Sequence, residues 1–395
     1  MKLLLSGRGH FLIPIALVTA LLGGAAGALS GTCGPFTDVA ADAFCPFVLE
    51  IFYLGITTGT TPTTYDPTST VSRLQMAAFL SRSVDGVLKR GSRRASMNQL
   101  WTTQSAAALG TTSMGGATPR HLQFDGADIW AAGGSSSTVL RVRGSDARLL
   151  EIWTGATGAY AVVIGMNRVF VTGGGSPGKL FMIDPSLLAG VVTTVAMTLG
   201  NGPTQAAFDG GRVWTANSVT PGSVSIVTPG PTIPWTVTTF SVGIGSTAPD
   251  GIVWDGSNIW VTDGGLGTAV KLDASGGVLA TVTVGTFPQY PATDGTSIWV
   301  PNTLSNSVTV IRGSTGAVLQ TLTGNGLMNP TMAAFDGERV LVTNKIGDSV
   351  SLWKAADLTP LGSFSTGTGT SPEEACGDGI HFWIALPGTG KIGRF

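Results

Sequence analysis

One arrangement of apolar and polar positions recurs along the chain after residue 100. An apolar or aromatic residue precedes an Asp-Gly pair, a few polar residues follow, and an Ile-Trp-Val-Thr type of run then alternates like a β-strand. Copies of this pattern are Phe124–Trp130, Phe208–Trp214, Trp254–Trp260, Thr293–Trp299, Phe335–Leu341 and Gly377–Trp383. A degraded copy, Ile164–Phe170, has Gly165 in the place of the aspartate. The pattern therefore predicts seven β-rich repeats.

The spacing of the repeats indicates their architecture. The last position of the seven copies falls at residues 130, 170, 214, 260, 299, 341 and 383, so the period is about 42 residues. Short strands at this interval are typical of β-propeller blades, whereas helical repeats would show a 3.6-residue periodicity that is absent. Asp-Gly predicts a tight hairpin turn because glycine tolerates positive φ, and the aromatic residue is expected between neighbouring sheets.

The end of the chain predicts how the repeats close. Within one repeat, Ser307–Ile311 and Ala317–Thr323 are expected to form the third and outer strands. The seventh repeat ends after strand Gly390–Arg394 and lacks an outer strand, which Gln99–Leu109 could supply. We therefore predict a mainly β fold, a seven-bladed β-propeller over residues 98–395 that is closed by an N-terminal strand together with C-terminal strands.

Three of the repeats contain the residues of a known repeat type. These are Trp260–Asp263, Trp299–Asn302 and Val340–Asn344, each followed by a serine-valine type of strand. The region, about 300 residues, resembles the YVTN/NHL-type seven-bladed propellers, a group that includes virginiamycin B lyases. The resemblance implies the architecture alone, since propellers of this type include both binding proteins and enzymes.

Residues 29–86 follow a different, helical pattern. The aromatic and aliphatic stripe of Phe44–Tyr53 predicts a first helix. A Thr/Pro-rich loop precedes a second helix that begins at Ser72, where Gln75 completes a capping-box pattern. The predicted module is a small helix–loop–helix, separated from the propeller by a basic, flexible linker at residues 87–97.

Three segments of this module, Phe36–Val39, Tyr53–Gly59 and Tyr65–Met76, follow one another in the order and spacing of S-layer homology (SLH) domains. The module resembles such a domain over about 50 residues. The resemblance implies contact with cell-wall or surface polysaccharide, generally through three copies that share one binding surface, whereas this chain has a single copy. Arg73 is the candidate glycan contact, and the alternative is a solvated arginine at a helix start.

Composition narrows the partners and the location. Only 11% of the residues are charged and the formal net charge is −1, so the chain lacks the long-range field that attracts nucleic acid. The positive Lys2 and Arg8, the apolar Phe11–Leu22 and the small-residue site Ala26–Ala28 indicate a secretory signal over residues 1–28. This apolar run is shorter than the ~20 residues of a membrane span, which favours a cleaved signal over a retained anchor. We expect an extracytoplasmic protein without a transmembrane segment after cleavage.

Cysteine and histidine positions do not form a recognisable metal site. Cys33 and Cys45 could pair in an oxidising compartment, and Cys376 falls in a strand pattern where a buried, inert thiol is expected. The three histidines are His10, His121 and His381. No Cys/His spacing is that of a zinc site, so no metal or cofactor is predicted.

The propeller architecture predicts which residues meet at one mouth of the central channel. One set of these residues lies four and five positions before each Asp-Gly pair. The other set lies at the end of the strand that follows the pair. The candidates for ligand binding are Arg120, His121, Tyr160, Gln205, Asp250, Tyr290, Glu373, Glu374, Asp263, Asn302 and Asn344. Because the first and seventh blades are neighbours, Arg120 and His121 are expected beside Glu373 and Glu374. His121 and Glu374 are the candidates for acid–base catalysis, and the alternative is a salt-bridged structural mouth.

These features predict an exported, envelope-associated binding or scaffold protein. Its SLH-like module would contact wall or surface glycan, and its propeller would present a recognition face to a protein or carbohydrate. The alternative is a secreted propeller enzyme, a lyase or hydrolase similar to virginiamycin B lyase, acting at the channel mouth. The lack of a complete catalytic set favours a protein that is not an enzyme, and a purely structural surface component is equally compatible with the sequence.

Overall fold

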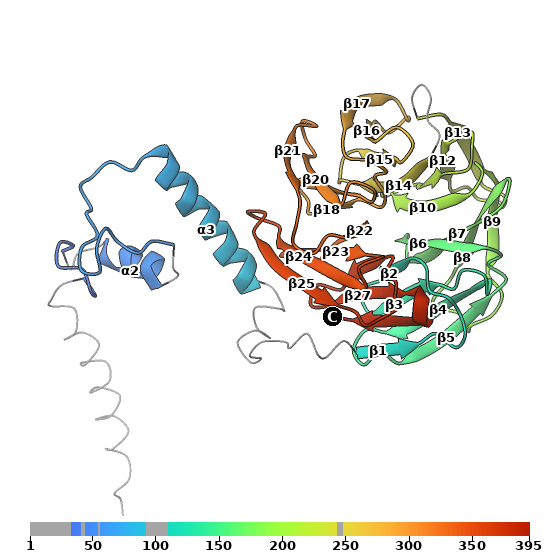
Figure 1. Cartoon of the computed structure of the whole chain (residues 1–395), viewed down its shortest axis with the longest axis horizontal. Coiled ribbons are helices and arrows are strands. Elements are labelled where there is room, and N and C mark those ends of the chain that lie inside the picture. Colours follow the sequence, from blue (N-terminus) through green and yellow to red (C-terminus); the bar gives the residue numbers. More distant parts are fainter. Residues whose placement is uncertain (1–32, 41–43, 54–55, 92–109, 243–247) are drawn as a thin grey trace, which may run out of the picture. The chain divides into compact units, whose positions relative to one another are not determined.

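The computed structural model describes residues 33–40, 44–53, 56–91, 110–242 and 248–395. The chain divides into two compact units, Met1–Gly91 and Ser92–Phe395, and each is described by itself (Figure 1). The predicted signal at residues 1–28 lies outside the described residues. No helix within the described ranges is long and apolar enough to cross a membrane.

The first unit contains helices α2 (Cys45–Tyr53) and α3 (Arg73–Gly91). The predicted capping box is present at the start of α3, since the Gln75 amide donates to Ser72 Oγ at 3.2 Å and the Ser72 amide donates to Gln75 Oε1 at 2.9 Å. Helix α3 extends to Gly91, so residues 87–91 of the expected linker are helical, and the remainder, 92–97, lies outside the described residues.

The segments of the first unit are held together around Phe36, which is fully buried. Its ring packs against those of Phe52 and Tyr65, with centroids 5.0 and 5.5 Å away. The Asp38 carboxylate accepts hydrogen bonds from the backbone amides of Tyr65 and Asp66, which ties the first segment to the loop before α3. A disulfide joins Cys33 to Cys45 at the start of α2. One small core and one crosslink therefore stabilise this helix–loop–helix.

The described part of the second unit contains seven four-stranded antiparallel sheets, arranged as a ring around a central axis (Figure 1). Each innermost strand contacts the innermost strand of the next sheet, and β26 contacts β2, so the ring is closed. The innermost strands are β2 (Leu122–Phe124), β6 (Ala159–Gly165), β10 (Pro203–Phe208), β14 (Pro249–Trp254), β18 (Ala292–Thr293), β22 (Pro330–Phe335) and β26 (Ala375–Gly377). The structure is the predicted seven-bladed β-propeller.

The other strands follow in chain order away from the axis. The second strands are β3 (Asp128–Ala132), β7 (Arg168–Gly173), β11 (Val213–Asn217), β15 (Ile259–Asp263), β19 (Ser297–Asn302), β23 (Arg339–Asn344) and β27 (Phe382–Leu386). The third strands are β4 (Thr138–Arg143), β8 (Gly178–Ile183), β12 (Ser223–Thr228), β16 (Thr268–Leu272), β20 (Ser307–Arg312), β24 (Ser349–Lys354) and β28 (Lys391–Arg394). The outer strands are β5 (Leu149–Thr154), β9 (Thr193–Leu199), β13 (Thr236–Phe240), β17 (Val278–Thr283), β21 (Val318–Leu322), β25 (Pro360–Ser365) and β1 (Gly110–Ser113).

Strand β1 completes the last sheet. It pairs antiparallel with β28, with Gly110 opposite Arg394 and Ser113 opposite Lys391. The segment expected in this role, Gln99–Leu109, lies immediately before β1 and outside the described residues. A short 3-10 helix, η1 (Pro387–Thr389), joins β27 to β28. One sheet therefore joins the beginning and the end of this unit.

The core lies between neighbouring sheets, where the repeated tryptophans are fully buried. In five repeats the aspartate of the Asp-Gly pair accepts a hydrogen bond from the indole Nε1 of the tryptophan five residues later, at 2.7–2.9 Å. These pairs are Asp125–Trp130, Asp209–Trp214, Asp255–Trp260, Asp294–Trp299 and Asp378–Trp383. The predicted turns are confirmed, with φ of 96° at Gly256 and 90° at Gly295. The second role of the aspartate, as acceptor for a buried indole N–H, was not predicted.

The two repeats that lack the aspartate–tryptophan pair follow the same chemistry. Gly165 takes the place of aspartate where Phe170 takes the place of tryptophan, so neither donor nor acceptor is present. In the sixth repeat Leu341 replaces the tryptophan, and Asp336 Oδ2 accepts a hydrogen bond from Arg339 Nε at 3.0 Å instead. A buried acceptor therefore occurs where a donor is available to satisfy it.

Candidate functional site

The starts of the innermost strands meet at one end of the ring, as the architecture predicts. Arg120 Nη1 donates to Glu373 Oε2 at 2.6 Å, which joins the first and seventh blades. Lys345 forms a second ion pair with Glu373, and the Arg120 guanidinium lies 5.6 Å from the centre of the Tyr160 ring. Sequence reasoning missed Lys345, although it directly follows Asn344, a residue named for that face. The outer surface of this end is therefore an ion-pair cluster in which two cationic side chains share one carboxylate.

Beneath that cluster, His121 and Glu374 form a buried pair. Their side chains are only 4% and 1% exposed, and His121 Nε2 lies 3.7 Å from Glu374 Oε2. The Val162 amide donates to His121 Nδ1 at 3.2 Å, which assigns the ring proton to Nε2. Burial lowers the pKa of His121 to about 4. Burial, followed by the nearby Glu373 charge, raises the pKa of Glu374 well above its ordinary value.

Two tyrosines bridge this end of the channel. Tyr160 lies in β6 and Tyr290 precedes β18, two sheets that are not neighbours in the ring, yet their hydroxyl oxygens are 3.1 Å apart. Burial raises the pKa of Tyr160 to about 12 and raises that of Tyr290 well above its usual value. The predicted mouth is therefore crossed by a hydrogen-bonded pair of neutral phenols.

Asp250 and Asp263 occupy the fourth blade at the same end. Pro249 pairs with Asp263 in the sheet, which brings the two carboxyl groups near each other. Burial, and then the Asp263 charge, raises the pKa of Asp250 to about 7. Asp250 Oδ2 is buried and makes no hydrogen bond within the described residues. Asp263 Oδ1 accepts the amides of Gly265 and Leu266 at 3.0 Å and so stabilises its own turn.

The two candidate asparagines brace their own sheets. Asn302 Nδ2 donates to the hydroxyls of Ser307 and Thr309, at 3.1 and 3.0 Å. Asn344 Nδ2 likewise donates to Ser349 and Ser351, at 3.2 and 2.8 Å. Both asparagines are fully buried. Their amide groups are committed within the blades, and we leave them out of the proposed ligand site.

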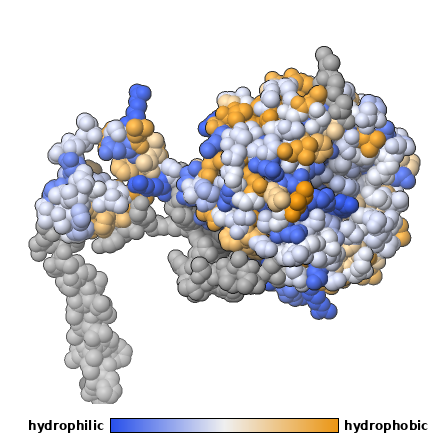
Figure 2. Space-filling view, viewed as in Figure 1, coloured by the Kyte–Doolittle hydropathy of each residue, from blue (hydrophilic) through white to orange (hydrophobic). Residues whose placement is uncertain are grey.

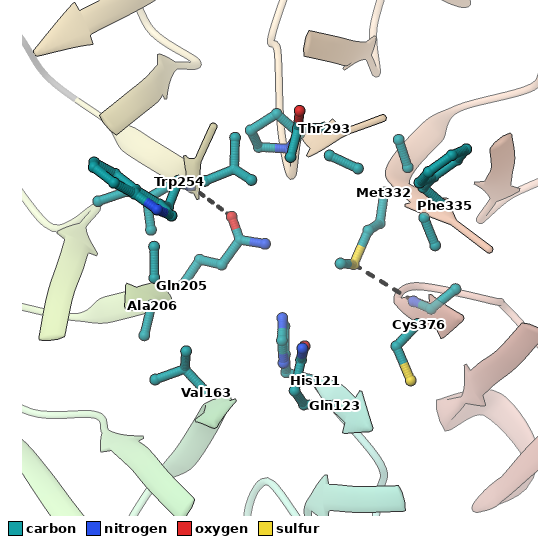
Figure 3. Close-up of a pocket in the computed structure, with 18 of the residues that line it drawn as sticks. His121, Gln123, Val163, Gln205, Ala206, Trp254, Thr293, Met332, Phe335 and Cys376 are labelled. Atoms are coloured by element: carbon teal, nitrogen blue, oxygen red, sulfur yellow. Dashed lines mark hydrogen bonds between the residues drawn. The ribbon is translucent and has the colours of Figure 1, made fainter. Parts of the chain in front are cut away.

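Behind the tyrosine bridge lies a cavity of about 390 Å³ along the axis of the ring (Figure 3). All seven innermost strands or the residues flanking them contribute to its wall, which includes His121, Gln205, Met332 and Cys376. The Ile252 amide donates to Gln205 Oε1 at 2.6 Å, and the amide nitrogen of Gln205 points toward the middle of the cavity (Figure 3). Met332 Sδ accepts the Ala375 amide at 3.4 Å. Gln205 is therefore held against one wall with a free donor facing inward.

The described residues do not include a group of three or more His, Cys, Asp and Glu side chains placed to hold a metal ion. Cys376 is a buried free thiol, and burial raises its pKa, which keeps it protonated and unreactive. The site is therefore best described by hydrogen bonding, ion pairing and apolar contact.

Arg73, the candidate glycan contact, is the first residue of α3 and its side chain is exposed. Arg82 of the same helix differs, because its Nη1 donates to the Ile56 carbonyl at 3.0 Å. Arg82 therefore supports the fold of the unit, whereas Arg73 is presented to solvent.

The surface of the propeller shows no single dominant patch from the side drawn in Figure 2. Small hydrophilic and hydrophobic areas alternate with residues of intermediate hydropathy over the visible face. This mixed surface agrees with the low charged fraction of the chain, 11%. Recognition is therefore expected to depend on local groups rather than on a broad electrostatic field.

Comparison with known proteins gives three results. The S-layer homology domain model matches residues 35–77. No curated protein matches the sequence. The propeller is similar to a streptogramin B lyase structure, with 13% identity, a TM-score of 0.63, and coverage of 74% of this chain and 99% of that one. It is similar to virginiamycin B lyase from Staphylococcus aureus, with 14% identity, a TM-score of 0.61, and coverage of 73% and 98%.

A WD40 propeller domain, that of Doa1, matches nearly as well, with 11% identity, a TM-score of 0.58, and coverage of 73% of this chain and 97% of that one. Similarities at this level of identity establish a shared fold and not a shared activity. The chain thus combines an S-layer homology domain at residues 35–77 with a seven-bladed β-propeller that resembles virginiamycin B lyase in fold.

Proposed function

We propose that this is an exported protein that binds cell-envelope polysaccharide through its SLH domain and presents the propeller as an extracytoplasmic binding domain. The observation that carries the proposal is the SLH match at residues 35–77 in the same chain as a complete propeller ring. Domains of this family contact cell-wall polysaccharide, which supports a surface location. The disulfide between Cys33 and Cys45 supports an oxidising compartment.

Arg73 is the proposed glycan contact within the SLH domain. Its guanidinium is exposed at the start of α3, close in sequence to the loop that Asp38 fixes through the Tyr65 and Asp66 amides. A planar guanidinium with several N–H donors is well suited to hydroxyl and carboxylate groups of a wall polysaccharide. The fixed loop and the exposed arginine together form the proposed contact surface.

The propeller end formed by Arg120, Lys345 and Glu373 is the proposed recognition face for a protein or carbohydrate. Its charges are paired with one another but remain partly exposed, with 34% of the Arg120 side chain and 42% of the Lys345 side chain accessible. Acid–base catalysis requires a group within hydrogen-bond reach of the substrate. His121 and Glu374 are buried beneath this surface, so binding is better supported than catalysis at this end.

The test is cosedimentation of the purified mature protein with cell-wall polysaccharide isolated from the producing organism. Arg73→Ala is expected to lower the bound fraction severalfold, because it removes the exposed donor group. Arg312→Ala is the matched control, since it removes one exposed arginine from the propeller instead. Equal binding by Arg73→Ala and Arg312→Ala would show that Arg73 is not the contact. Absence of binding by the unchanged protein would contradict envelope attachment.

A second candidate function is a lyase activity at the same end of the propeller. The observation in its favour is the buried carboxyl of Glu374, whose pKa is raised by burial and whose Oε2 makes no hydrogen bond within the described residues and lies beside the His121 ring. One similar structure is a virginiamycin B lyase with quinupristin, so quinupristin is the substrate to test. Turnover detected by mass spectrometry and lost in His121→Ala would replace the binding proposal for this face. We expect no turnover.

A further inference from the structure

The axial cavity is accessible from the end of the ring opposite to the tyrosine bridge. Its wall at the bridged end includes His121, Gln205 and Met332, all buried. At the other end the wall is formed by the residues just before the Asp-Gly turns, which are only half-buried. These residues are Ile164, Phe208, Trp254, Thr293, Phe335 and Gly377. Solvent and ligands therefore reach the cavity through the turn end.

The wall of the cavity favours an uncharged, apolar occupant. None of its described lining residues is Asp, Glu, Lys or Arg, and His121 is neutral because burial lowers its pKa to about 4. Half of the remaining lining residues are alanine, valine and isoleucine from the innermost strands. A charged group in such surroundings would lose hydration without gaining a partner. The volume, about 390 Å³, falls within the range of small-molecule sites.

Three aromatic side chains, Phe208, Trp254 and Phe335, stand at the open end of the cavity. Figure 3 shows Trp254 and Phe335 on different sides of the central space. The rings also pack against the cores between neighbouring sheets, so each presents only its half-exposed part to the opening. The body of the ligand is therefore expected to contact these rings.

Gln205 presents a hydrogen-bond donor to the cavity at its closed end. Gln205 is 3% exposed, and its Oε1 is occupied by the Ile252 amide, which fixes the orientation of the side-chain amide. Its Nε2 points into the cavity and makes no hydrogen bond to any described residue (Figure 3). A ligand with an oxygen acceptor at its leading end would satisfy this buried group.

We propose that the axial channel is a binding site for a neutral, mainly apolar small molecule that carries a carbonyl oxygen. The molecule enters past Phe208, Trp254 and Phe335, and its oxygen accepts a hydrogen bond from Gln205 Nε2 at the closed end. This site is separate from the ion-pair face of Arg120 and Glu373 and from the SLH domain. It therefore goes beyond the proposed function and does not depend on envelope binding.

The test uses the mature full-length protein and prodan, a neutral aromatic fluorophore with a carbonyl group whose emission shifts to the blue in apolar surroundings. We expect saturable binding with a blue-shifted emission. Thr293→Trp narrows the opening, and the fold should accept it because Trp254 occupies the same position in the preceding blade. This variant should weaken prodan binding about tenfold or more. Leu304→Trp adds the same side chain on the exposed loop that follows β19, away from the opening. This variant should bind prodan normally.

Gln205→Glu tests the hydrogen bond. A carboxyl group still offers an acceptor to the Ile252 amide but no longer presents an amide donor to the ligand. Prodan affinity should fall about tenfold, whereas the prodan analogue without its propionyl group should bind both proteins equally. Unsaturable or absent binding would overturn the site, as would equal prodan affinity in Thr293→Trp and the unchanged protein. Equal prodan affinity in Gln205→Glu would overturn the assigned orientation.

Discussion

The repeated aspartate–tryptophan hydrogen bond makes a quantitative prediction about stability. In the fourth blade Asp255 Oδ2 accepts the Trp260 indole N–H at 2.9 Å, and Asp255 Oδ1 accepts the amides of Ser257 and Asn258 at 2.8 and 2.7 Å. Asp255→Asn can retain the turn through its oxygen but then presents an NH2 group to the indole N–H. Two donors would face each other at a buried position, because Trp260 is fully buried.

The expected cost of Asp255→Asn is about 2 kcal/mol of unfolding free energy, since a hydrogen bond to a charged group is lost and a buried donor is left unsatisfied. Trp260→Phe should cost about 2 kcal/mol through the same lost bond and the smaller ring. When Trp260 is already phenylalanine, no indole donor remains. Replacing Asp255 should then lower the free energy of unfolding much less than it does in the unchanged protein. The coupling energy between the two positions should therefore be about 1–2 kcal/mol.

Urea unfolding followed by tryptophan fluorescence measures these values. All ten tryptophans lie at or after residue 101, so the signal reports the propeller and not the SLH domain. Trp353→Phe is the matched control, because Trp353 is also buried but its indole makes no hydrogen bond to a repeat aspartate. That variant should show no coupling to Asp255→Asn. If the two single costs simply add in the Asp255→Asn, Trp260→Phe protein, the aspartate serves the turn alone and the reasoning is refuted.

Further predictions concern protonation and the disulfide. Burial raises the pKa of Asp250 to about 7, so the folded chain holds a proton that the unfolded chain releases above about pH 4. The free energy of unfolding should therefore fall as pH rises from about 4 to about 7. Asp250→Asn should remove that decrease, so between pH 4 and pH 8 its free energy of unfolding in urea titrations should gain about 2–4 kcal/mol relative to that of the unchanged protein. No gain would contradict a raised pKa at Asp250. Asp348, whose pKa is lowered chiefly by backbone amides, should behave oppositely: the stability lost in Asp348→Asn should be greatest above about pH 4 and should shrink as pH falls below that value through the lowered pKa. Replacing Cys33 and Cys45 by serine should destabilise the SLH domain by about 2–3 kcal/mol, seen as faster proteolysis before residue 91; unchanged proteolysis would show that the crosslink does not matter.

Much of the fold could be predicted because its determinants are local. The capping box at Ser72 and Gln75 lies within four residues, and the Asp-Gly turns depend on the φ of single glycines such as Gly256. The indole acceptor was also readable in principle. Gly165 replaces aspartate in the repeat where Phe170 replaces tryptophan, which is a correlated signal of donor and acceptor.

The candidate site could be predicted only in part. Ring closure alone places Arg120 near Glu373, and the structure joins them at 2.6 Å. The bridge between Tyr160 and Tyr290 was not predictable, because it joins two sheets that are not neighbours and depends on both side-chain conformations. Asn302 was predicted to bind a ligand at the mouth, and only the structure shows that its amide donates to hydroxyls of its own sheet.

The sequence by itself determined the number of blades, the SLH domain and the residues that start each innermost strand, because periodicity and motif spacing are properties of short segments. Only the tertiary structure decided which end of the channel is bridged and which end is open. It also decided that the pKa of His121 is lowered and that of Glu374 is raised, since desolvation depends on every group packed around them. Those surroundings come from blades far apart in the chain, and no local pattern encodes them.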